Sequence, residues 1–327
     1  MSWQSELACW MLRRQVRPKT LSPVIDVADA RALAARRRPF ATRVPAGWRL
    51  RESYGQEGGQ GGHDAAPRDP LRGEWLEPVD VTPAAAPTLL YFHGGGYYFC
   101  TPATHRPLVF GLAARAKART FSSDYRLAPE HPFPAAHDDA LAAYAALLEA
   151  GVDPASIVVA GDSAGGGLAL ALLVALRDRG APLPAGAVLF SPWTDLAATG
   201  ATLVTNDGAD PMFAGAALAR AARLYVGDAS ATDPYVSPLY ADPAGLPPLL
   251  IQAGSTEVLL DDSRRFAERA QAAGVEVELQ VWPRMPHVWQ MAVPFVPEAR
   301  RALDDAAAFV RRVTARRAQP QAQIAIA

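Results

Sequence analysis

The chain has 327 residues, of which 50% are hydrophobic and 20% are charged, an ordinary globular composition with enough length for a large core. The formal net charge of -1 gives no global field that would favour nucleic acid or a membrane surface. The two cysteines, Cys9 and Cys100, are too few for a disulfide framework, so we expect buried thiols, as in a cytoplasmic protein.

The N-terminal segment predicts helices rather than a targeting sequence. Its Arg13, Arg14 and Arg17 follow a short apolar stretch, the reverse of the order in a secretory signal. Over residues 1–43, nine Lys or Arg stand against three Asp or Glu, which favours solvated amphipathic helices, with a basic patch for an acidic partner as the alternative. The longest apolar run, 168–176, is too short to span a bilayer, so we expect no stable membrane insertion.

The chain after these helices is organised as alternating strands and helices. We assign residues 1–50 to N-terminal cap helices and 51–317 to the main domain, with a surface loop or hairpin tip at 55–73 and a flexible tail at 318–327. Strands are predicted at 88–93, 119–125, 156–161, 186–191, 248–254 and 275–282, and helices at about 105–118, 135–151, 164–180, 259–273 and 298–317.

This alternation predicts an α/β fold, with a mostly parallel sheet covered by helices on both faces. Residues 195–247 interrupt it, because they contain Pro and Asp turns and one helical pattern at 213–226. We expect this insertion to lie over the carboxyl edge of the sheet and to form a cap together with the N-terminal helices.

A serine stands at the turn between a predicted strand and a predicted helix. The stretch GDSAG places Ser163 between glycines, so that a sharp turn can expose its hydroxyl beside a helix N-terminus. A phosphate-binding turn is the alternative, but no Gly-Lys-Ser/Thr follows. We therefore expect Ser163 to be a nucleophile and Asp162 to orient the turn.

Three consecutive glycines follow the strand 88–93. The amides of Gly94, Gly95 and Gly96 would be unshielded, and with the amide of Ala164 they could bind a developing oxyanion. His93, which opens this loop, is expected to orient it by hydrogen bonds rather than to act as the base.

A nucleophilic serine needs a base and an orienting acid. His287 follows the last predicted strand, where a loop would rise over the carboxyl edge, and is the best placed of the six histidines. Glu257 comes just after the preceding strand, with Asp261 as the alternative acid. The order Ser163, Glu257, His287 is that of α/β-hydrolases.

Five motifs together resemble the bacterial hormone-sensitive lipase family of α/β-hydrolase esterases: HGGGYYF, SSDYRLAPEHPFPAAHDD, GDSAGG, SPWTDL and DPYVSPLY. They cover roughly residues 75–315 in consistent order. The resemblance implies a serine carboxylesterase that cleaves short acyl esters through an acyl-enzyme, without cofactor or metal, using the oxyanion donors named above. One departure is that many members carry Asp-Pro at the acid position, where this chain has Glu257 in Thr-Glu-Val.

The remaining expectations concern substrate and assembly. Tyr97, Met212, Phe213 and Trp289 could line an apolar substrate pocket, although core packing is an equal explanation for each. Lactone hydrolysis or deacetylation of a lipophilic acetyl ester would use the same triad, and a receptor that binds a small ligand without hydrolysis is the alternative of another class. The alternating segment 275–282 could be an edge strand that pairs two subunits into a homodimer.

Overall fold

The computed structural model describes residues 1–36, 42–54, 68–80 and 86–317. Its centre is an eight-stranded sheet in the order β1-β2-β4-β3-β5-β6-β7-β8. The pairs β1/β2 and β2/β4 are antiparallel, and all the others are parallel. The strands are β1 (Trp48–Ser53), β2 (Gly73–Pro78), β3 (Thr88–Phe92), β4 (Arg119–Ser123), β5 (Ile157–Asp162), β6 (Gly186–Phe190), β7 (Leu249–Gly254) and β8 (Val277–Trp282).

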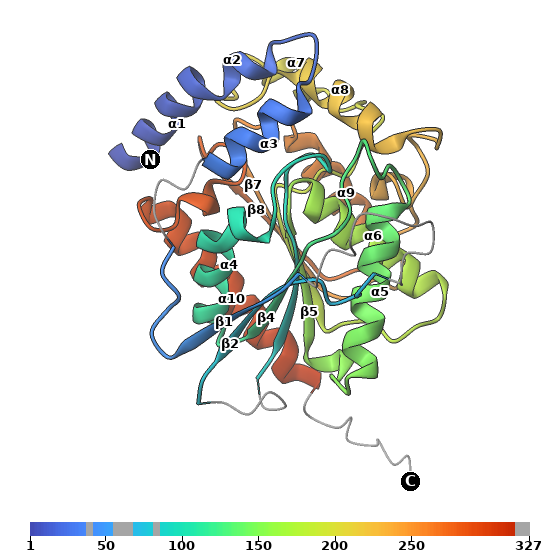
Figure 1. Ribbon diagram of the computed structural model, residues 1–327. Coiled ribbons are helices and arrows are strands. Elements are labelled where there is room, and N and C mark those ends of the chain that lie inside the picture. The colour runs from blue at the N-terminus through green and yellow to red at the C-terminus, as the bar shows by residue number, and fades with distance from the viewer. Residues whose placement is uncertain (37–41, 55–67, 81–85, 318–327) are drawn as a thin grey trace, which may run out of the picture.

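Helices cover both faces of this sheet (Figure 1). The helices α4 (Pro102–Ala116) and α10 (Pro297–Arg317) pack on one face, whereas α5 (Ala135–Glu149), α6 (Ala164–Asp178) and α9 (Leu260–Ala272) pack on the other. The predicted α/β architecture is confirmed, and each helix and strand predicted after residue 86 is present with its bounds shifted by a few residues.

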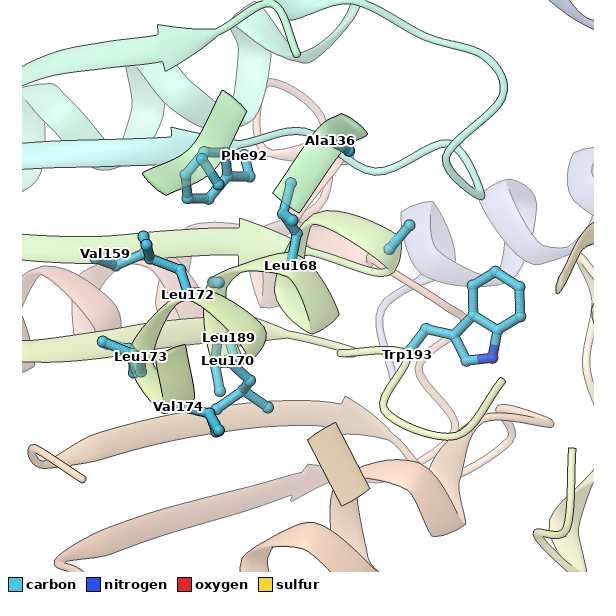
Figure 2. Close-up of a cluster of buried hydrophobic side chains, with 14 of the residues drawn as sticks. Phe92, Ala136, Val159, Leu168, Leu170, Leu172, Leu173, Val174, Leu189 and Trp193 are labelled. Atoms are coloured by element: carbon cyan, nitrogen blue, oxygen red, sulfur yellow. The ribbon is translucent and has the colours of Figure 1, made fainter. Parts of the chain in front are cut away.

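The central strands are apolar throughout because both of their faces are buried. In β3, Leu89 and Tyr91 enter the core under α4 and α10, while Leu90 and Phe92 enter the core under α5 and α6. Figure 2 shows the second core, where Leu168 and Leu172 of α6 lie among side chains of neighbouring strands. These two cores pack against both faces of the strands whose ends carry the candidate site.

Two strands escaped the sequence analysis. The antiparallel strands β1 and β2 extend one edge of the sheet, so the expected boundary at residue 50 falls inside β1. Of the surface loop expected at 55–73, residues 55–67 lie outside the described residues, and Gly73 begins β2. The expected tail, 318–327, is also outside them.

A helical cap lies over the carboxyl ends of the parallel strands (Figure 1). It consists of α1 (Trp3–Gln15), α2 (Arg17–Thr20) and α3 (Val27–Arg36) from the N-terminus, with α7 (Thr202–Thr205) and α8 (Gly215–Val226) from the insertion. Single-turn helices lie at Pro154–Ser156, Pro238–Tyr240 and Trp289–Ala292.

Arginines join the two parts of the cap. The Arg13 guanidinium donates to the carbonyl of Ala209 at 2.6 Å, and Arg17 pairs with Asp207 at 3.2 Å and donates to the carbonyl of Asp210 at 3.0 Å.

Every helix within the described ranges is too short or too polar to cross a membrane.

Candidate active site

Ser163 lies in the sharp turn between β5 and α6, with φ of 53° and ψ of -121°. A non-glycine residue in such a conformation costs about 1–3 kcal/mol, and the surrounding structure must enforce it. A Cβ at Gly165 would lie 2.1 Å from the Phe92 carbonyl oxygen, and one at Gly161 would lie 2.3 Å from the Gly165 carbonyl oxygen. The flanking glycines are therefore required by the close approach of β3 and α6.

His287 and Glu257 come together from loops after β8 and β7. The Nδ1–H of His287 donates to Glu257 Oε2 at 2.8 Å, and both side chains are buried. The other oxygen of Glu257 accepts from the Ser191 hydroxyl at 2.7 Å and from the Gly254 amide. The carboxylate is thus held on both oxygens, which fixes the orientation of the imidazole.

The surroundings of His287 make its imidazole more basic. Burial alone would lower the pKa of its imidazole, but the hydrogen bond and charge of Glu257, helped by Asp210 and Asp162, outweigh burial and raise the pKa above its usual value. Its Nε2 has no hydrogen-bond partner among the described residues, and the ring borders the same cavity as Ser163. Such a nitrogen is available to take a proton from a hydroxyl.

The glycine loop is tied to the serine turn through Asp162. The Oδ1 atom of Asp162 accepts from the Gly94 amide at 3.0 Å and from the Tyr91 hydroxyl at 2.5 Å, and its Oδ2 lies 3.2 Å from His105 Nε2. Burial opposes the ionisation of Asp162, but His105 and Tyr91 outweigh it and lower the pKa of the carboxyl. Asp162 therefore stays charged and holds the two turns together.

The next two glycines face the cavity. Gly95 and Gly96 have φ of 112° and 58°, and both line the cavity that contains Ser163. Burial and the nearby His105 lower the pKa of His93 to about 3, so its imidazole is neutral, and its Nδ1–H donates to the Gly94 carbonyl at 2.7 Å. His93 thus supports the loop from behind.

A cavity of about 530 Å³ lies between the cap and the strand ends. Its floor includes Ser163 and His287, and its walls include Met212 and Phe213 of the insertion. The Phe213 ring meets the His287 ring edge-to-face, with 5.1 Å between centroids. The N-terminal helices close the cavity from above with Leu12, Val16, Ile25, Ala30 and Leu33.

Three other candidates occupy structural positions. Tyr97 stacks on Tyr225 with 3.7 Å between ring centroids, and Trp289 packs beside Trp282 in the core under α10. Neither side chain is among the described residues that line the cavity. Asp261 lies in the first turn of α9 and accepts from the Thr202 amide at 3.0 Å.

Sequence reasoning missed Ser191, whose hydroxyl donates to Glu257 and accepts from the Val288 amide at 3.2 Å. It follows β6 at the carboxyl edge of the sheet, and that position is the signal that could have drawn attention to it.

Comparisons with known proteins give the family of this chain. A family model described as the alpha/beta hydrolase fold matches residues 89–291. An acetyl-hydrolase of Streptomyces hygroscopicus is 45% identical over 266 residues, which cover 81% of this chain and 88% of the relative. An esterase of Acinetobacter venetianus is 40% identical over 240 residues, which cover 73% of this chain and 79% of the relative.

Solved structures of esterases are similar over almost the whole chain. An esterase from the bacterial hormone-sensitive lipase family gives a TM-score of 0.83 at 38% identity, covering 96% of this chain and 99% of the other. The esterase EstE5, soaked with p-nitrophenyl butyrate, gives a TM-score of 0.84 at 36% identity, covering 96% and 100%. The chain therefore belongs to the α/β-hydrolase fold family. Within that class it is a carboxylic ester hydrolase of the bacterial hormone-sensitive lipase family.

Proposed function

We propose that Ser163, His287 and Glu257 form the catalytic triad of this ester hydrolase, and that its substrates carry short acyl chains. The observation that carries the proposal is the hydrogen bond between His287 and Glu257 at the wall of the cavity that contains Ser163. Glu257 accepts from the imidazole of His287, whereas the described contact of Asp261 is with the Thr202 amide, which favours Glu257 as the acid.

In the first half of the reaction, His287 Nε2 takes the proton of the Ser163 hydroxyl while the Ser163 oxygen bonds to the ester carbonyl carbon. The carbonyl oxygen becomes an oxyanion. When the tetrahedral intermediate collapses, the carbon–oxygen bond to the alcohol breaks, and the alcohol leaves with the proton from His287. Water then attacks the acyl-enzyme in the same way, which releases the acid and returns the proton to Ser163.

The amides of Gly95, Gly96 and Ala164 are the proposed oxyanion donors. The Gly94 amide is left out, because it already donates to Asp162. Each donor in such a site contributes about 2.7–4 kcal/mol to lowering the barrier. Of the expected pocket residues, Met212 and Phe213 remain in the proposal as apolar walls, and Tyr97 and Trp289 are left out.

The short-chain preference is supported by the relatives. One is named an acetyl-hydrolase, and a similar structure was soaked with p-nitrophenyl butyrate. The relatives are named as esterases and acetyl-hydrolases, which does not favour the alternatives of a small-ligand receptor or a lactone hydrolase.

The experiment is hydrolysis of p-nitrophenyl butyrate by wild type and by Ser163→Ala. We expect the variant to lose at least about 10⁴-fold in kcat while it keeps the wild-type Tm within a few degrees. The matched control is Ser156→Ala on the opposite end of β5, which should keep full activity. Turnover by a folded Ser163→Ala variant would overturn the assignment of the nucleophile.

Two expectations about the whole protein stay predictions. β8 is at one edge of the sheet, so pairing of two subunits through it is open to test by sedimentation. The cytoplasmic location is the other.

A further inference from the structure

The outer side of α1 exposes large apolar side chains. Trp3, Leu7 and Trp10 are spaced at i, i+4 and i+7 and therefore share one side of the helix. Trp3 is 64% exposed and Trp10 is 52% exposed, which is unusual for tryptophan on a globular protein. Met11 adds a further exposed apolar side chain beside them.

Positive charge lies along the same helix. Arg14 continues the apolar side at i+11, and its guanidinium stacks over the Trp10 ring at 4.8 Å from the centroid. Arg13 and Arg14 are both exposed and form no ion pair with the described residues, while Glu6 is the only acidic residue of α1. The helix is thus locally cationic on a chain whose net charge is -1.

The turn after α2 adds further exposed apolar side chains beside the cavity. Leu21 and Val24, in the turn between α2 and α3, are 61% and 72% exposed, and Val24 also lines the cavity. Leu12, on the opposite side of α1, and Val16, just after the helix, line the cavity that contains Ser163. Figure 1 shows α1 and α2 along the upper left edge of the molecule, at the outside of the cap.

We propose that α1 and the α2–α3 turn form a docking surface for an anionic lipid layer. Tryptophan and arginine together suit the headgroup level of such a layer, where the ring is partly buried and the guanidinium meets phosphate. The cationic helix matches an anionic surface, and the adjacent cavity is where an ester leaving that layer would be hydrolysed. The proposed docking is argued from the side chains of α1 and the α2–α3 turn, and only the delivery of an ester to the cavity rests on the proposed function.

The experiment measures binding to vesicles and uses the full chain with Ser163→Ala, so that no vesicle lipid is hydrolysed. The vesicles are phosphatidylcholine with about 30 mol% phosphatidylglycerol, compared with phosphatidylcholine alone. The test variant adds Trp10→Ser and Arg14→Glu. The matched control adds Val79→Ser, which removes an equally exposed apolar side chain near the end of β2.

We expect the Ser163→Ala protein and the Val79→Ser control to sediment with anionic vesicles, with binding that weakens as salt is added. The Trp10→Ser/Arg14→Glu variant should bind at least about tenfold more weakly, because it loses an interfacial ring and reverses a charge. With Ser163 restored, this variant should hydrolyse p-nitrophenyl butyrate within about twofold of wild type.

Three results would overturn the proposal. The first is no binding to anionic vesicles at low salt, and the second is equal binding by the double variant. The third is a dimer in solution that the double variant abolishes, with no vesicle binding, since the apolar side of α1 would then be covered by a second copy. None of these depends on whether Ser163 is the nucleophile.

Discussion

The carboxyl edge of the sheet and the N-terminal cap are built in different ways. At the sheet edge, Asp162 and Glu257 are buried and hydrogen-bonded on both oxygens. In the cap, α1 buries only Ser5, and α3 buries no residue. The alpha/beta hydrolase match also begins at residue 89, after the N-terminal cap helices. We therefore expect the reaction chemistry to depend on the buried sheet edge, and substrate access and choice to depend on the N-terminal cap, which buries few side chains.

After the loss of the Ser163 hydroxyl, the largest effect should come from removing the charge of Glu257. We expect Glu257→Gln to lower kcat/KM about 10³- to 10⁴-fold, because the amide cannot stabilise the imidazolium or fix its tautomer. In the proposed mechanism activity needs neutral His287, and because the pKa of His287 is raised above its usual value, we expect the acidic limb of the kcat/KM profile to lie above pH 6.5. Because Glu257→Gln removes the charge that raises the pKa of His287, the acidic limb of its kcat/KM profile should move to lower pH.

The matched control is Asp261→Asn, on the alternative acid four residues away. The kcat/KM of Asp261→Asn should stay within about threefold of the wild-type value, and its pH profile should not shift. If Asp261→Asn produced the larger loss, the acid would be misassigned.

A smaller loss is expected from Gly95→Ala. The added Cβ would lie 2.1 Å from the Phe99 carbonyl oxygen at a φ of 112°, so the loop must shift and misplace its amides. We expect kcat to fall about 10²-fold with little change in KM. Gly151→Ala is the control, since it has φ of 80° with open space around it and should affect stability alone.

Arg31 connects the two regions. Its guanidinium donates to the carbonyls of Tyr98 and Ala128 at 2.9 Å and pairs with Glu130 at 2.7 Å, which ties α3 to the glycine loop. Arg31→Ala should raise KM about threefold to tenfold and leave kcat within threefold. Arg36→Ala, on the same helix, is the control. A loss confined to kcat would contradict the division between the regions.

The smallest effect is expected at Glu298, which anchors α1. Its carboxylate accepts from the Ser2 hydroxyl at 2.7 Å and the Ser5 hydroxyl at 2.9 Å. Burial opposes its ionisation, but these hydrogen bonds outweigh burial and lower its pKa to about 2. The anchoring is complete above about pH 4.5, the usual pKa, and is lost as pH falls towards 2.

Glu298→Ala should therefore raise hydrogen exchange across α1 at neutral pH while kcat for p-nitrophenyl butyrate stays within about twofold. The wild-type protein should show the same raised hydrogen exchange of α1 only when the pH falls below about 4.5. Equal protection of α1 in both proteins would mean that other contacts hold the helix.

The sequence predicted the sheet from β3 onwards because those strands are apolar runs between helical repeats. It missed β1, whose charged Arg49, Arg51 and Glu52 hide the alternation of an edge strand. The site residues next to strand ends were found because parallel strands bring their carboxyl ends to one edge.

Partners that depend on tertiary contact could not be found in this way. Arg31 meets the glycine loop from about 70 residues away, and its sequence neighbours carry no motif. Tyr97 and Trp289 were equally uncertain, because an aromatic side chain suits a pocket wall and a core alike, and only packing decides between them.

The shared carboxylate of Asp162 has a consequence for redesign. Because it holds the serine turn and the glycine loop to each other, we expect the geometry of the reaction centre to be set before any substrate enters. Substitutions in Met212, Phe213 or α1–α3, which line the cavity, are therefore expected to change which esters are cleaved while the proposed triad stays in place.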